Sequence, residues 1–321
     1  MIARLAALAA ALVLLALPAS GQAQAFPARA IRIVVPAGAG GAADLLARAV
    51  GEAMGAALGT SVVIENRGGA GGIIGADAVA KAAPDGHTLL VTSNTLVIAP
   101  ALYKVPYDTE KDFAPVGLMA TAPNLLVASA DLGVKTLADL IALARREAGR
   151  LAYGSPAVGS AAHLTVEMLA RAAGIRLTHV PFKGPQQAIM ETIAGRVPIT
   201  IAGVSNALPH LKAGKLIGLA VAGDERSRLV PGVPTFAVAG VWGVYAALWF
   251  AMLAPAATPR PVLDRLNVQL NAALKAPEVQ ARLDALGFDA TGGPAQRLGD
   301  AMRREIPFYA AVVRDAGIKV E

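Results

Sequence analysis

The chain is 321 residues long, carries a formal net charge of +6 and contains no cysteine. The absence of cysteine excludes thiolate nucleophiles, thiolate metal sites, disulfides and a lipid anchor on an N-terminal cysteine. The length is ample for a core that needs no disulfides, and it suggests two domains. Lys and Arg are spread without long runs, so the basic balance indicates a solvated surface and no nucleic-acid partner.

The first 25 residues have the pattern of a secretory signal peptide. Arg4 precedes an apolar run at 5–17, a proline ends that run, and Ala-Gln-Ala at 23–25 offers small residues to a signal peptidase. The run is shorter than the roughly 20 apolar residues that span a bilayer. Residues 1–25 are therefore predicted to be a cleavable signal peptide that exports a chain starting at Phe26 to the periplasm. An uncleaved membrane anchor stays as the alternative.

The mature chain alternates short β-branched runs with helical patterns, which indicates an α/β fold with largely parallel sheets. Residues 113–129 have few charges and no helical period, so they are expected to be extended chain crossing between domains. Before this crossing, strands are predicted at 31–35, 61–65 and 87–93, and helices at about 44–58 and 74–82.

A second alternating unit follows the crossing, and a second extended apolar stretch at 243–255 leads back. Its predicted elements are helix 137–148, strand 151–155, helix 160–173, strand 176–180, helix 185–195, strand 197–203, helix 206–213 and strand 215–223. Helices at 260–275, 277–286 and 294–316 close the chain. Two crossings predict two α/β lobes with a ligand cleft between them: lobe 1 from 26–121 and 251–321, and lobe 2 from 122–250.

A Gly-rich turn, PAGAGGAAD, follows the first predicted strand. Gly38, Gly40 and Ala43 fit G-x-G-x-x-[G/A], and Glu65 ends the next strand, which taken alone is a dinucleotide-binding fingerprint. A proline before the first glycine, a second Gly cluster at 67–75 and the predicted export argue against a nicotinamide cofactor. No cofactor is predicted, and a tight turn without any ligand stays as an alternative.

The same turn places free amides at a helix N-terminus, where partial positive charge suits a carboxylate as well as a phosphate. A second strand, loop and helix of this kind run through YGSPAVGSAAHL (153–164), with Ser160 the expected N-cap. The two N-termini are expected to face each other across the cleft and to bind an anion without any Arg.

Catalytic and metal-binding motifs are missing from the sequence. The histidines have no metal-ligand spacing, and there is no nucleophile elbow or phosphate-binding loop. Catalytic groups can converge in space from distant positions, so an exported enzyme stays as an alternative. The sequence favours a binding protein without a metal.

Six segments, which span essentially the whole mature chain, follow the order found in one known family. They are IRIVVPAGAGGAADLLAR (31–48), VVIENRGGAGGIIGADAVAKAAPDGHTLL (62–90), YGSPAVGSAAHLTVEML (153–169), HVPFKGPQQA (179–188), ALPHLKAGKLIGLAV (207–221) and RSRLVPGVPTF (226–236). The block at 62–90 is the most specific of them. The chain resembles the substrate-binding proteins of the tripartite tricarboxylate transporter family, the Bug receptors.

The resemblance implies a two-lobe periplasmic binding protein, type II-like, that closes on a small carboxylate and is not an enzyme. It implies that backbone amides and ordered water in two loops hold one ligand carboxylate. Carried over, Gly38 to Gly41 supply amides or hold water, Asp44 caps its helix and orients the loop, and Val158 to Ser160 supply the opposing N-terminus. Three further turns, at 93–95, 182–184 and 204–206, are expected to line the remaining wall. The candidate ligand-binding residues are Ala37, Gly38, Ala39, Gly40, Gly41, Asp44, Ser93, Asn94, Thr95, Ser155, Ala157, Val158, Gly159, Ser160, Phe182, Lys183, Val204 and Ser205.

The chain departs from the family pattern at positions expected to shape the pocket. Ala37 and Ala39 stand where the family usually has an aromatic residue and a proline. Ala157 stands in place of a glycine, and Phe182 in place of a tyrosine. Lys183 is the only cation in these loops, so a mono- or dicarboxylate with a partly apolar body is expected rather than citrate.

The implied partners are the small carboxylate and the membrane subunits of a tripartite tricarboxylate-type transporter. The receptor is expected to be a monomer. A receptor that serves a signalling partner would share this sequence, and it stays as an alternative function.

Overall fold

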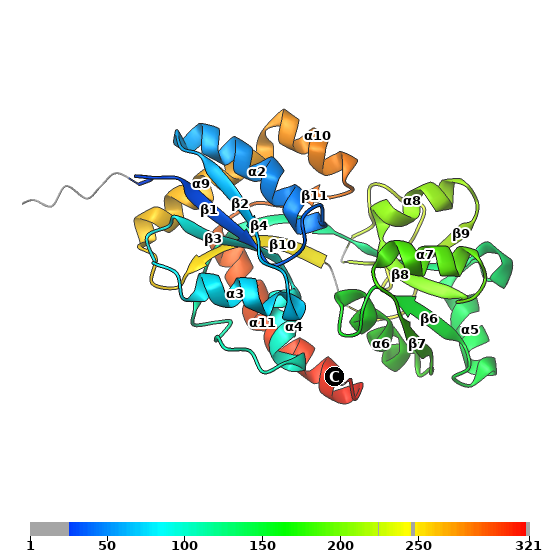
Figure 1. Ribbon diagram of the computed structural model, residues 1–321. Coiled ribbons are helices and arrows are strands. Elements are labelled where there is room, and N and C mark those ends of the chain that lie inside the picture. The colour runs from blue at the N-terminus through cyan, green and yellow to red at the C-terminus, as the bar shows by residue number, and fades with distance from the viewer. Residues whose placement is uncertain (1–25, 224, 245–247, 319–321) are drawn as a thin grey trace, which may run out of the picture.

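A computed structural model describes residues 26–223, 225–244 and 248–318 (Figure 1). The predicted signal peptide at 1–25 lies outside these residues. Within the described ranges, no helix combines the length and the apolar character needed to cross a membrane.

Six strands form the first of two sheets, in the order β11-β4-β10-β3-β1-β2. Their bounds are β1 Ile31–Val35, β2 Val62–Asn66, β3 Thr88–Ser93, β4 Phe113–Ala122, β10 Leu248–Pro255 and β11 Asp289–Ala290. β1 pairs in parallel with β2 and β3, whereas β10 runs antiparallel between β3 and β4. The part of the molecule built on this sheet is called lobe 1 below.

Five strands form the second sheet, in the order β7-β6-β8-β5-β9. Their bounds are β5 Asn124–Ser129, β6 Ala152–Ser155, β7 Thr178–Pro181, β8 Ile199–Gly203 and β9 Leu216–Ala222. β6 pairs in parallel with β7 and β8, and β5 runs antiparallel between β8 and β9. This part, lobe 2, therefore repeats the pattern of lobe 1, and the predicted two-lobe α/β fold is confirmed.

Helices cover both faces of each sheet (Figure 1). Lobe 1 carries α2 Ala42–Leu58, α3 Ile73–Ala80, α4 Thr95–Leu102, α9 Arg260–Lys275, α10 Pro277–Ala285 and α11 Ala295–Asp315, and lobe 2 carries α5 Leu137–Glu147, α6 Ala161–Ala173, α7 Pro185–Ile193 and α8 Val204–Lys212. Two short 3-10 turns lie at Ala70–Gly72 and Ala130–Leu132. Most of these elements begin and end within about two residues of the predicted bounds.

Two elements were not predicted. α4 has the sequence TLVIAPAL, which is apolar all round and contains Pro100. Its first residues are buried, so it has no polar face and no helical period in the sequence. β11 is only two residues long, too short to leave a strand pattern.

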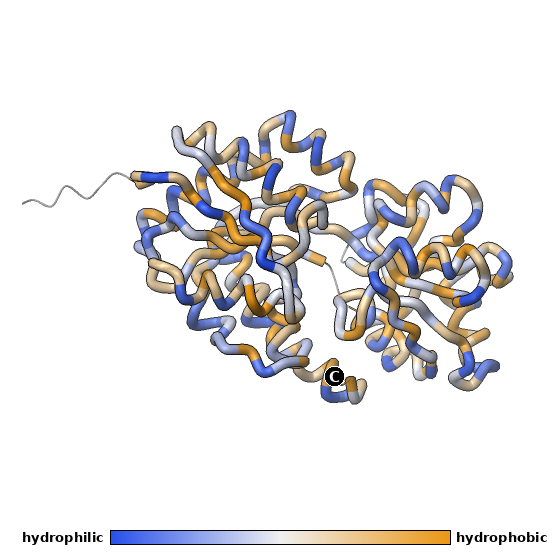
Figure 2. Tube along the Cα trace, viewed as in Figure 1, coloured by the Kyte–Doolittle hydropathy of each residue, from blue (hydrophilic) through white to orange (hydrophobic). Residues whose placement is uncertain are grey.

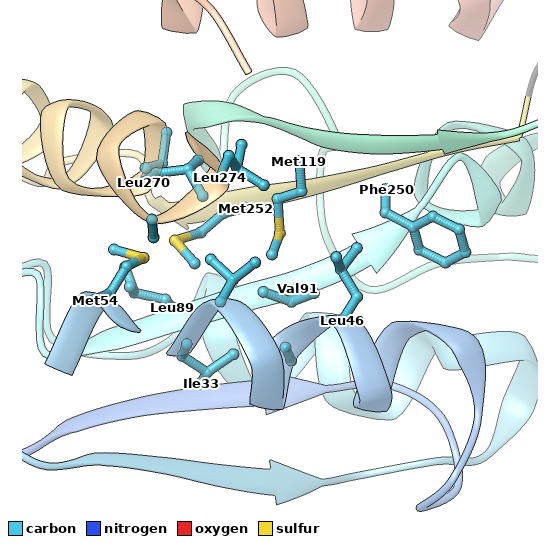
Figure 3. Packing of buried hydrophobic residues seen from close by; sticks show 14 of the residues in the cluster. Ile33, Leu46, Met54, Leu89, Val91, Met119, Phe250, Met252, Leu270 and Leu274 are labelled. Atoms are coloured by element: carbon cyan, nitrogen blue, oxygen red, sulfur yellow. The ribbon is translucent and has the colours of Figure 1, made fainter. Parts of the chain in front are cut away.

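The core of lobe 1 lies on both faces of its sheet. On one face, Leu46 of α2 and Leu270 of α9 pack against side chains from the central strands, such as Leu89 and Met252 (Figure 3). On the other face, α3, α4 and α11 bury a second cluster. Hydrophobic residues gather on the strands, and hydrophilic residues on the outer helix surfaces (Figure 2). The sheet thus positions the helices that pack on its two faces.

The first crossing between the lobes takes a single residue. β4 ends at Ala122, which pairs with Leu248, and β5 begins at Asn124, which pairs with Gly203 and Ala222. Pro123 between them has no N–H to donate to a ladder, so one long strand is broken into two strands of different sheets. The predicted extended chain at 113–129 is confirmed. The domain boundaries at 121 and 251 stay predictions.

Several helices begin directly after the strands of the two sheets. β1 leads into α2, β3 into α4, β6 into α6, β7 into α7 and β8 into α8. Since helices that follow parallel strands begin at the carboxyl edge of the sheet, each lobe presents helix N-termini along that edge. This is where an α/β fold holds ligands.

Candidate ligand-binding site

A cavity of about 540 Å³ lies between the two lobes. It is lined by the first residues of α2 and α4 from lobe 1 and of α6, α7 and α8 from lobe 2. None of its described lining residues is charged. Polar side chains come from Asn94, Thr95, Asn124, Ser160, Ser205 and Asn206.

Helix N-termini give this cavity a positive field without any cation. The first amides of a helix have no intrahelical acceptor, and each N-terminus carries a partial charge of roughly +0.5. Ala42 in α2 and Ala161 and Ala162 in α6 line the cavity in such first-turn positions. The arrangement is suited to bind a carboxylate through backbone N–H groups from both lobes.

The loop before α2 is held by Asp44. The N-cap of α2 is Gly41 and Asp44 lies in the first turn, so the expectation that Asp44 caps this helix is wrong. The side chain instead accepts a 2.8 Å hydrogen bond from the amide of Gly40, and it also binds Arg48 and Asn66. Burial opposes ionisation of Asp44, but the hydrogen bonds from Arg48, Gly40 and Asn66 together lower its pKa below the usual value. The charged carboxylate of Asp44 therefore holds the loop in place. Its hydrogen bond with the Gly40 amide means that this amide already has a partner.

The loop before α6 is held by its own helix. Ser160 is the N-cap, as predicted, and its Oγ accepts a hydrogen bond from the amide of His163. The amide of Gly159 donates to Nδ1 of His163 over 2.9 Å, and the amide of Ser160 donates to the Ala157 carbonyl. Two of the three amides expected to meet the ligand, those of Gly159 and Ser160, thus have internal partners. The residues of this helix end that line the cavity are Ser160, Ala161 and Ala162.

A stack of aromatic rings packs against this loop. The rings of His163 and His179 are parallel, with centroids 3.8 Å apart, and His179 lies on Tyr153. Nε2 of His179 and Oγ of Ser155 are 2.7 Å apart. Burial, and then the neighbouring His179, lowers the pKa of His163 to about 3. His163 is therefore neutral at physiological pH, which leaves Nδ1 free of a proton to accept from Gly159.

Seven of the predicted residues line the cavity: Gly40, Gly41, Asn94, Thr95, Ser160, Ser205 and, from the predicted turn at 204–206, Asn206. The others lie behind it or beside it. Phe182 packs on Gly154 of β6, and Lys183 is exposed, with its amide bound to Gln187. Ser155 is buried against His179. The remaining predicted residues outside the lining are Ala37, Gly38, Ala39, Asp44, Ser93, Ala157, Val158, Gly159 and Val204.

An apolar wall of the cavity was missed by the sequence reading. Leu45 comes from α2, Leu248 begins β10, and Leu286 and Phe288 flank the turn between α10 and β11. These residues are scattered over the chain, and each belongs to a segment that reads as ordinary core. Asn124, at the start of β5, was missed for the same reason. The wall suits a ligand whose body is partly apolar.

The described residues contain no group of three or more His, Asp or Glu side chains placed to hold a metal ion. The fold and the amide-rich cavity between two α/β lobes define a solute-binding receptor.

Comparison with known proteins gives the family. Residues 46–317 match the family described as "Tripartite tricarboxylate transporter family receptor". The curated relative "Protein BugT" of Bordetella pertussis (strain Tohama I) is 34% identical over 302 residues, which cover 93% of each chain. The chain belongs to the tripartite tricarboxylate transporter receptors, the periplasmic binding proteins also called Bug proteins.

Two solved structures are similar over nearly the whole described chain. An R. palustris protein solved with adipate has a TM-score of 0.78 and 35% identity, covering 92% of this chain and 99% of its own. MatC from Rhodopseudomonas palustris, solved with bound malate, has a TM-score of 0.75 and 34% identity, covering 90% and 100%. The relatives therefore share this fold and bind small carboxylates.

Proposed function

We propose that this receptor captures a small mono- or dicarboxylate in the cavity between its lobes and delivers it to the membrane subunits of a tripartite tricarboxylate-type transporter. The observation that carries the proposal is the convergence of five helix N-termini on a cavity without a charged lining residue among those described. A carboxylate placed there would exchange water for first-turn amides of α2 and α6.

The apolar wall favours a ligand with one or two carboxylates over a tri-anion. Each additional charge that enters a desolvated cavity needs its own hydrogen bonds or a cation. Leu45, Leu248, Leu286 and Phe288 supply neither, so they suit methylene or aromatic groups between or beyond the carboxylates. The adipate and malate bound by the two R. palustris relatives are both dicarboxylates.

Export is part of the proposal. Residues 1–25 would be removed on passage to the periplasm, where the family works. Ligand binding would then bring together lobe 1 (26–121 and 251–321) and lobe 2 (122–250). The chain would bend at the two crossings between them. Pro123, the single residue between β4 and β5, supports a bend at that point.

The test is direct binding. Titration calorimetry and thermal melting of the purified mature chain can be done with adipate, malate, citrate and the uncharged analogue 1,6-hexanediol. These four ligands separate the effect of the ligand's charge from the effect of its apolar body. A dicarboxylate should bind and raise the melting temperature by mass action, whereas the diol should not. Uptake into cells that hold the transporter's membrane subunits should need this receptor. If no carboxylate of the panel binds, the proposal is wrong.

A further inference from the structure

The turn between α10 and β11, residues 284–289, rests on lobe 2. A side chain on Gly287 would place its Cβ 2.3 Å from the Cβ of Ser205, at the N-terminus of α8. Real Cβ atoms do not come this close, so only a glycine permits the approach. Gly287 is also buried and has φ of +72°, a backbone conformation that glycine adopts without strain. The lobes therefore touch at a point where no side chain fits between them.

Arg228 of lobe 2 holds the same turn at its two ends. Its guanidinium lies 2.6 Å from Asp289 and 3.1 Å from Asp284, and these two carboxylates flank Gly287. The pKa of Arg228 is raised by the hydrogen bonds to Asp289 and Asp284. The pairs are solvent-exposed, so they add little to the stability of the fold. They orient the turn against lobe 2.

The turn also completes the cavity. Leu286 and Phe288, on either side of Gly287, belong to the apolar wall. Ser205, which Gly287 touches, lines the cavity from the opposite lobe. The turn that rests on α8 is thus also part of the wall that would enclose a ligand.

We propose that Gly287 and Arg228 are positioning residues that set how closely the lobes approach and how long the ligand is retained. The proposal rests on the proposed function, since the ligand has to occupy this cavity. Any side chain at position 287 would act as a spacer between the lobes. Loss of Arg228 would leave the contact possible but poorly oriented.

The first experiment compares Gly287→Ala with Gly214→Ala. Gly214 has a similar φ of +67°, but a Cβ there meets nothing within 4 Å. Gly287→Ala should raise the adipate dissociation rate roughly tenfold, because overpacking at a close contact has to be relieved by separating the lobes. Gly214→Ala should change it little. Adding Ser205→Gly to Gly287→Ala should bring the rate most of the way back to that of Ser205→Gly alone, since the Ser205 Cα would still lie 3.2 Å from the added Cβ.

A second readout measures the distance between the lobes directly, both without and with a ligand. Because the chain has no cysteine, spin labels can be placed on cysteines introduced at two exposed positions, Val268 of lobe 1 and Met190 of lobe 2. Pulsed EPR with and without adipate should show longer distances for Gly287→Ala, and Ser205→Gly should reverse this. If Gly287→Ala changes neither the distances nor the dissociation rate, the inference is wrong. If the distances change as expected but no carboxylate binds, the proposed function fails and the contact stands.

A third arm tests Arg228. Arg228→Leu should raise the adipate dissociation rate a few-fold at low salt, and the difference should shrink at high salt because exposed ion pairs are screened. Arg226→Leu is the matched control, since Arg226 binds the Pro231 carbonyl within lobe 2. Equal effects of the two variants would contradict a role for Arg228 in retention.

Discussion

The amide of Gly159 donates a 2.9 Å hydrogen bond to Nδ1 of His163, and both groups are buried. This bond ties the loop that follows β6 to the first turn of α6, directly behind the cavity. Gly159 itself touches lobe 1, because a Cβ there would lie 2.4 Å from Leu102. Substitution of Gly159 would therefore test packing between the lobes rather than the anion site. His163 is the residue through which the loop can be tested.

His163→Leu should weaken both the fold and the ligand site. Leucine leaves the buried Gly159 amide without an acceptor, which costs about 1–3 kcal/mol of unfolding free energy. His163→Asn places an amide oxygen near the position of Nδ1, so it should retain more stability and more affinity for adipate. Urea denaturation and calorimetry give the two quantities. Equal losses for Asn and Leu would show that the hydrogen bond does not position the loop.

The low pKa of His163 predicts a loss of stability in mild acid. The folded state holds His163 neutral down to a pKa of about 3, whereas the unfolded chain binds a proton near the ordinary value of 6.5. The stabilisation is therefore complete above pH 6.5 and falls as the pH drops from 6.5 toward 3, by about 1.4 kcal/mol per pH unit for one such group. Burial also lowers the pKa of His179, so it adds to this slope.

Urea denaturation at pH 7, 6 and 5 measures this slope. His163→Asn should be less stable at pH 7 but flatter with pH, because only His179 remains to titrate in the stack. Asp44 and other paired carboxylates act at lower pH, since their pKa values are lowered and their contribution is lost only in stronger acid. If the unfolding free energy of His163→Asn depends on pH as steeply as that of the wild type, a group other than His163 causes the slope.

Asn206→Asp should abolish carboxylate binding while preserving the fold. Asn206 lies in the first turn of α8 and lines the cavity. A negative side chain there is favourable for the helix, so folding should be unaffected or slightly improved. The same charge would repel a ligand carboxylate and should lower affinity by roughly a hundredfold or more. Calorimetry with adipate checks this.

Gln187→Glu is the matched control for that variant. It also adds a negative charge of nearly equal shape in the first turn of a helix, α7, but Gln187 does not line the cavity. Its affinity should stay close to that of the wild type. A similar loss in both variants would point to a general charge effect instead of a site in this cavity.

Asp44→Asn should loosen the loop before α2. The substitution removes the charge that Arg48 and the Gly40 amide stabilise, and a roughly tenfold rise in the adipate dissociation constant is expected, about 1.4 kcal/mol. Asp77→Asn removes an ion pair of the same i,i+4 spacing, with Lys81, away from the cavity. Calorimetry should show an effect for Asp44→Asn alone.

Much of the frame was predictable because local patterns decide it. β1 and α9 begin and end at the predicted residues, and Ser160 caps α6 as its position before the helix indicates. The positions of the two Gly-rich loops beside the cavity also follow from strand-to-helix order. Asp44 was misplaced as a cap because a carboxylate in the first turn and one at the N-cap look alike in a sequence.

The remaining features depend on contacts between distant segments. The burial of His163 could not be predicted, since nothing in the sequence places His179 on its ring. Leu286 and Phe288 approach the cavity only because β11 joins the edge of the six-stranded sheet. Gly287 looks like any helix-ending glycine, and its meeting with Ser205 is decided by how two lobes come together.

The five helix ends around the cavity have one further consequence. They carry the same sign of partial charge, two from lobe 1 and three from lobe 2. These ends repel each other across the cavity, which adds a cost to closing the lobes without an anion. An anion reverses the sign of that interaction and becomes the counterion shared by both halves. The transporter's membrane subunits would then meet a shut receptor chiefly when it holds cargo, which limits unproductive docking.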